Sequence, residues 1–119
     1  GTGQLLTCSI YRPCEGDIKL LVTRSAKGLK EGWVHVPQLA PSPALFRDYM
    51  RWREAGQWPA KWPVYEARFL EEMQAPEPQR YLARIRQRLA EGKFVVVACY
   101  CHDERYCHRS LIRRLVEGG

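Results

Sequence analysis

The sequence contains no long apolar run and no low-complexity tract, and these absences exclude several classes of protein. No stretch of its 119 residues approaches the roughly 18 continuous apolar residues of a membrane-spanning helix. The first residues carry neither the positive charge nor the apolar stretch of a secretory signal peptide. No internal repeat of the kind that builds solenoids is present. We therefore expect a cytoplasmic protein without membrane contact, and we interpret residues 1–3 as a cloning remnant.

Acidic residues are scarce relative to basic ones. The chain has 19 Lys and Arg against 13 Asp and Glu, which gives a net charge of +6 and a pI of about 9.3. A positive excess favours anionic partners such as phosphates or nucleic acid. Arg80, Arg84 and Arg88 form one row at helical spacing. Such a row is either a phosphate-binding face or a solvated face paired with glutamates.

The five cysteines are odd in number, and three of them crowd one loop rather than spreading as a disulfide framework, which indicates a reduced environment. Three of them lie in residues 99–109, which read Cys-Tyr-Cys-His-Asp-Glu-Arg-Tyr-Cys-His-Arg. This loop follows the most strand-like run of the chain, residues 94–98, and precedes an apolar helical pattern over 110–116. Ligand sites of open α/β sheets form at the carboxyl ends of strands, so we expect the functional site in this loop.

Apolar periodicity and turn residues predict a single α/β domain over residues 1–119. Strands are expected over 5–11, 18–23 and 94–98, with a minor strand over 33–36. Helices are expected over 43–56, around 65–73, over 78–90 and over 110–116. The run 94–98 is apolar throughout, which is typical of a strand buried on both faces at the centre of a sheet. The predicted fold class is therefore a small mixed or parallel sheet flanked by helices.

Cys107 and His108 are the candidate catalytic residues. Free backbone N–H groups and the dipole at a helix amino end, together with Arg109, favour a thiolate and hence a depressed pKa at Cys107. The imidazole of His108 titrates near neutral pH, as a general acid or base must. Arg109 can hold an anion bidentately. The other polar residues of the loop are assigned to ligand binding with it, namely Cys99, Cys101, His102 and Arg105.

The same side chains also match the ligands of zinc, which takes thiolates and imidazoles. Their spacing, C-x-C-H-x4-C-H, matches none of the common zinc layouts, such as paired C-x2-C knuckles. We therefore assign no metal ligand and no cofactor, and expect less than stoichiometric zinc in the purified protein. Cys99 and Arg105 have the spacing of a cysteine-phosphatase loop, but the residues between them include no glycine to wrap a phosphate. Simple packing of small buried thiols is a third interpretation.

Taken together, these segments resemble the domain of unknown function 488 family. In that family a strand ends in Cys, and a Cys-His-Arg triplet follows at the separation seen here between Cys99 and residues 107–109. Residues 10–13, 20–24, 27–30, 39–42, 45–47 and 62–69 are similar to one branch of it. The resemblance implies an α/β fold and a site around Cys99 and the triplet, and it implies no particular reaction. Where many relatives have Cys-Ala-Glu, this chain has Cys99-Tyr100-Cys101, so a thiol replaces a carboxylate.

The pattern as a whole favours binding of a phosphate-bearing ligand, either a nucleotide or a nucleic acid, at the Cys/His/Arg loop. Processing of that ligand by a cysteine-dependent enzyme is the stronger form of this hypothesis. The alternative is a non-catalytic binding or adaptor module whose cysteine loop is structural, with or without zinc. The reactivity of the Cys107 thiol at neutral pH distinguishes the two.

Overall fold

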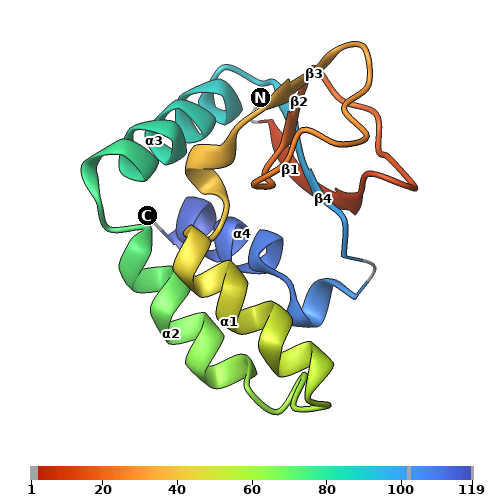
Figure 1. The fold of residues 1–119 in the computed structure, drawn as a ribbon. Coiled ribbons are helices and arrows are strands. Elements are labelled where there is room, and N and C mark those ends of the chain that lie inside the picture. The colour runs from red at the N-terminus through yellow and green to blue at the C-terminus, as the bar shows by residue number, and fades with distance from the viewer. Residues whose placement is uncertain (1–2, 102, 119) are drawn as a thin grey trace.

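Four strands form one sheet on one side of the molecule (Figure 1). The computed structural model describes residues 3–101 and 103–118. Within them the strand order is β1 (Gln4–Ser9), β4 (Phe94–Cys99), β2 (Ile18–Leu21), β3 (Trp33–His35), and every neighbouring pair is parallel. Five of the six residues of β4 are buried. The predicted α/β class and the interior position of this strand are confirmed, and the sheet is wholly parallel.

Four α-helices complete the described part of the chain: α1 (Pro43–Glu54), α2 (Trp62–Glu72), α3 (Pro76–Ala90) and α4 (His108–Gly118). Figure 1 shows α4 between the sheet and the α1–α2 pair, with α3 alongside the sheet. Three of these helices begin with a proline in the first turn. We expected Pro63 and Pro76 to lie outside helices, and this was wrong. A proline in the first turn lacks only an N–H that would be unpaired anyway, so it starts a helix there.

The two faces of β4 pack into two separate cores. Val95 and Val97 face the helices and join the main cluster, which includes Phe69 of α2 and Leu111 of α4. Val96 and Ala98 face the other way and join a smaller cluster, which includes loop residues such as Ile10. Alternate residues of one strand therefore bury into both layers, as expected for a central parallel strand. None of the helices in the described residues is long and apolar enough to cross a membrane.

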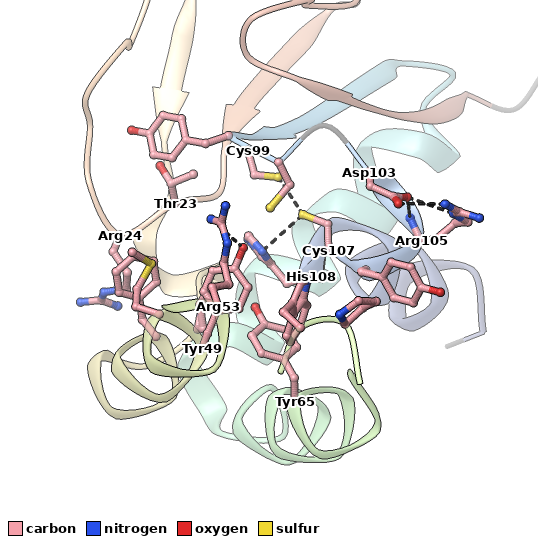
Figure 2. Close-up of a pocket in the computed structure, with 18 residues that line it drawn as sticks. Thr23, Arg24, Tyr49, Arg53, Tyr65, Cys99, Asp103, Arg105, Cys107 and His108 are labelled. Carbon is pink, nitrogen blue, oxygen red and sulfur yellow. Dashed lines mark hydrogen bonds and ion pairs between the residues drawn. The ribbon is translucent and has the colours of Figure 1, made fainter. Parts of the chain in front are cut away.

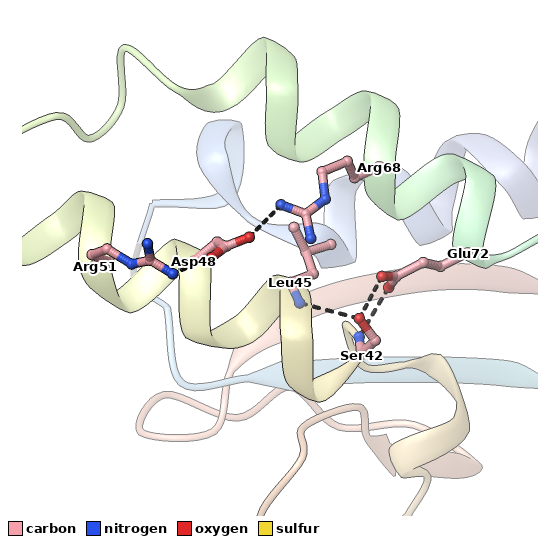
Figure 3. A network of polar contacts seen from close by, with 6 residues as sticks. All are labelled: Ser42, Leu45, Asp48, Arg51, Arg68 and Glu72. Atoms are coloured by element: carbon pink, nitrogen blue, oxygen red, sulfur yellow. Dashed lines mark hydrogen bonds and ion pairs between the residues drawn. The ribbon is translucent and has the colours of Figure 1, made fainter.

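A polar network joins α1 to α2 (Figure 3). The hydroxyl oxygen of Ser42 accepts the backbone N–H of Leu45 at 3.1 Å, which caps α1. The backbone N–H of Ser42 donates to the Glu72 carboxylate at 2.9 Å, and its hydroxyl donates to the same group. Further along α1, Asp48 accepts from Arg51 and Arg68, each at 2.6 Å. These contacts fix the angle between the two helices.

The parallel sheet brings the segment after β2 and the segment after β4 to the same edge. After Cys99 the chain passes through a 3-10 turn, Glu104–Tyr106, and returns to begin α4 at His108. We expected this helix to begin at Ser110, so its first turn starts two residues earlier than predicted. Cys107 consequently lies directly before the helix, in an extended conformation, rather than in its first turn.

Candidate functional site

A cavity of about 660 Å³ opens at this edge of the sheet, between the end of β4 and the α1–α2 pair (Figure 2). Its lining comes from the segment after β2, from α1, from the start of α2, and from the loop that leads into α4. The volume lies in the range of small-molecule and cofactor sites. The polar and reactive side chains that line this cavity are therefore candidates for a binding site.

Three sulfur atoms form the floor of the cavity, and we call Cys99, Cys101 and Cys107 the sulfur cluster. All three atoms lie within 4.8 Å of one another, and the Sγ atoms of Cys99 and Cys107 are 2.8 Å apart. Cys99 and Cys107 are each 1% exposed, whereas Cys101 is partly exposed. Cys99 ends a strand and Cys107 precedes a helix, so the 3-10 turn between them is what brings the sulfurs together.

Arg109 contacts the sulfur cluster on the side away from the cavity. The residue is 3% exposed, and its Nη1 donates to the Sγ of Cys99 at 3.2 Å and to the backbone carbonyl of Cys101 at 2.7 Å. The side chain therefore fixes the loop and places a positive charge beside the thiols. Arg109 was predicted to hold an anion, but it is not among the described residues that line the cavity.

The orientation of His108 is set by a backbone carbonyl. Its Nε2 lies 2.6 Å from the carbonyl oxygen of Val22, which can only accept, so Nε2 carries a proton. Burial lowers the pKa of His108, which favours the neutral ring and leaves Nδ1 unprotonated. Nδ1 lies 3.8 Å from the Sγ of Cys107. His108 is thus placed to accept the proton of this thiol.

The prediction of a depressed pKa at Cys107 is wrong. Burial is the main cause that raises the pKa of Cys107 well above its usual value, and the neighbouring thiols add to it. Hydrogen bonds from Cys107 and Cys99 instead lower the pKa of Cys101 to about 2. The hydrogen bond to Cys101 is the main cause that raises the pKa of Cys99 to about 12. Cys101 is therefore the first of the three to lose its proton, because two thiols donate to it.

The side of the cavity facing the sulfur cluster is apolar, and we call its residues the apolar wall: Phe46, Tyr49, Met50, Trp58 and Tyr65. The Tyr49 and Trp58 rings meet edge to face with centroids 4.8 Å apart, and Trp58 meets Tyr65 in the same way at 5.5 Å. Phe46 and Met50 are 41% and 38% exposed. The wall therefore combines interlocked rings with apolar side chains that are open to a ligand.

Three arginines also line the cavity, namely Arg24, Arg53 and Arg105. Arg105 pairs with Asp103 at 3.0 Å, and Arg53 lies over the Tyr49 ring, 5.6 Å from its centroid. Only Arg105 was among the predicted site residues. Arg24 could have been found from its position directly after the predicted strand 18–23, whereas no signal in the sequence pointed to Arg53.

Two other groups of residues that the sequence singled out are not among the described residues that line the cavity. His102 lies outside the described residues. Arg80, Arg84 and Arg88 lie on α3 and do not line the cavity. Arg88 pairs with Glu91 at 2.9 Å, and Arg84 lies over the Tyr81 ring. The structure therefore gives this row no part in the cavity.

The fold and the loop define a parallel α/β domain with a cysteine-floored cavity at the carboxyl edge of its sheet. The family model DUF488-N3a, described as the active DUF488-N3 subclade, matches residues 8–118. The chain belongs to this family, which confirms the resemblance stated from its Cys-His-Arg triplet. No curated protein and no solved structure shows significant similarity to the chain.

Proposed function

We propose that the cavity binds a small phosphate-bearing ligand of the nucleotide type. The observation that supports this most directly is the pairing of the apolar wall with Arg24 and Arg53 in one cavity. Aromatic rings stack on the faces of bases, and guanidinium groups bind phosphates in a planar, bidentate manner. The two halves of a nucleotide therefore have matching surfaces at the same site.

The charge balance of the lining also favours an anion. Three arginines line the cavity against a single carboxylate, Asp103, and that carboxylate is already paired with Arg105. Arg24 and Arg53 lie outside that pair. A cavity of about 660 Å³ holds a mononucleotide but no stretch of duplex, so we favour a nucleotide over a nucleic acid.

Cysteine-dependent processing, with Cys107 and His108 as catalytic residues, stays a prediction. The geometry supports it less than binding, because the Cys107 thiol is 1% exposed and its pKa is raised. A buried, protonated thiol is a poor nucleophile. The function we propose is accordingly recognition of the ligand, with the sulfur cluster beneath it.

Calorimetric titration with AMP, ADP and ATP tests this proposal. The double variant Arg24→Ala/Arg53→Ala should weaken the tightest of the three complexes by at least about a hundredfold, since two charge-assisted contacts are lost and each costs about 1.5–3 kcal/mol. The matched control Arg84→Ala/Arg88→Ala removes the same charge from α3 and should leave the affinity within about twofold.

Three results would contradict the proposal. Equal weakening by both double variants would mean that the attraction is the general charge of the protein. If the nucleoside without phosphate bound as tightly as the nucleotides, the site would not recognise the phosphate. An absence of binding by all three nucleotides would instead support the adaptor alternative.

A further inference from the structure

We propose that Cys99, Cys101 and Cys107 together bind one zinc ion, with the fourth coordination position facing the cavity. The first argument is the number and type of ligands. Three thiolates and one open position form a known arrangement for zinc, since catalytic sites keep three protein ligands and leave the fourth position to water or substrate. All three cysteines line the cavity, so the open position would face it.

The distances fit this assignment. Zinc holds sulfur at about 2.3 Å in a tetrahedron, which places two bound sulfurs about 3.8 Å apart. In the cluster the sulfur pairs span from 2.8 Å, between Cys99 and Cys107, to at most 4.8 Å. The tetrahedral value lies between these limits. Side-chain rotations that move each sulfur by about 1 Å therefore suffice, without a change in the backbone.

Arg109 provides the matching charge. A zinc ion with three thiolates carries a net charge of −1, and burial of that charge requires a compensating group. The Arg109 guanidinium donates to the Sγ of Cys99, and the described part of the chain pairs it with no carboxylate. The cluster, the ion and Arg109 are together neutral. A donor to a ligating sulfur is also the kind of outer contact that orients metal ligands.

The remaining two cysteines supply an internal contrast. Cys8 and Cys14 are also neighbours, because the backbone N–H of Cys14 donates to the Sγ of Cys8 at 3.2 Å. They form a pair rather than a trio, and neither lines the cavity. Substitutions at Cys14 therefore serve as controls for the loss of a thiol that holds no metal.

Elemental analysis of protein purified with reductant and without chelator is the test. We expect about one zinc ion per chain in the wild type and in Cys14→Ser, and a clear loss in Cys101→Ser. Cys101 is chosen because it is partly exposed in a loop, so its variant should fold, and circular dichroism checks that it does. Replacing zinc by cobalt should give the wild type the strong visible absorption of tetrahedral thiolate coordination. Cys101→Ser should lack this absorption.

The proposal is overturned if folded wild type carries no zinc and takes up none when zinc is added at equal concentration. It is also overturned if zinc remains bound in Cys101→Ser. A Cys99–Cys107 disulfide in protein purified in air without reductant, together with no zinc in the reduced protein, would also overturn the proposal and make the cluster a redox pair. Nucleotide titration of chelated protein separates this test from that of the proposed function, because the arginines and the apolar wall do not depend on the ion.

Discussion

The floor and the wall of the cavity are built in opposite ways. In and directly beneath the floor, Cys99, Cys107, His108 and Arg109 are buried, and their hydrogen bonds are made to one another or to the backbone. On the wall, Phe46 and Met50 of α1 remain about two-fifths exposed. A buried, bonded floor is preorganised, whereas exposed side chains can adjust to what they meet. The floor is therefore suited to fixed chemistry and the wall to the shape of the ligand.

Breaking the floor should have the largest effect. Arg109→Leu removes the bonds to the Cys99 sulfur and the Cys101 carbonyl, both in a buried setting, so we expect the free energy of unfolding to fall by about 2–4 kcal/mol. Denaturant unfolding measures this loss. The control Arg105→Ala removes a side chain that is 79% exposed and should change the value by less than about 0.5 kcal/mol. Similar losses in the two variants would show that the floor is not specially ordered.

Breaking the support of the wall should have an intermediate effect. Ser42→Ala removes the cap of α1 and one partner of Glu72, and we expect a loss of about 1–2 kcal/mol in the free energy of unfolding. Ser42→Thr keeps a capping hydroxyl and should recover most of this. Hydrogen exchange at the Leu45 amide should accelerate in the alanine variant alone. Unchanged exchange there would mean that contacts other than the cap hold α1.

Changing the surface of the wall should affect binding more than folding. Phe46→Ala should weaken nucleotide binding by about tenfold, because stacking of a base on an aromatic ring contributes about 1–3 kcal/mol. The free energy of unfolding should change little, since Phe46 is 41% exposed. Val64→Ala is the matched control, because Val64 is 45% exposed on α2 and does not line the cavity. If Val64→Ala weakens binding as much, the ligand does not rest on this wall.

The smallest effect should come from the ion pairs behind the wall. The hydrogen bond from Arg68 is the main cause that holds the pKa of Asp48 below its usual value of 3.8. The stability that this pair contributes is therefore present above that value and is lost as the pH falls through the lower folded-state pKa. Asp48→Asn should lower the Tm slightly at neutral pH, and the difference from wild type should vanish in strong acid. A difference that persists unchanged in acid would exclude this ion pair as its cause.

Much of the fold could be predicted because its elements obey local rules. The continuous apolar run of β4, the Ser42-Pro43 start of α1 and the helical spacing of Leu82 and Ile85 each depend on neighbours in the sequence. The errors lie at boundaries, where Pro76 and His108 begin helices earlier than expected. A proline breaks a helix in its interior and begins one in its first turn, and the sequence alone does not show which position it occupies.

The site was less predictable, because it depends on contacts between distant elements. The sequence located the cysteine loop but gave no reason to place Arg53 or Phe46 opposite it. The pKa of Cys107 was misjudged because burial outweighs the nearby helix dipole. The spacing of the cysteines also did not show that a strand end, a loop residue and the residue before a helix bring the three sulfurs together.

The position of β4 between β1 and β2 has a consequence for the order in which the protein is made. Within the described residues β1 pairs with β4 alone, and β4 is synthesised about ninety residues later. The strands β1, β2 and β3 therefore leave the ribosome before β4, and the sheet cannot be completed until residues 94–99 have been made. The strand that completes the sheet ends at Cys99, and the other two residues of the sulfur cluster follow it within eight residues. Folding and assembly of the site are thus one event in time, and a nascent chain released before residue 94 would have neither.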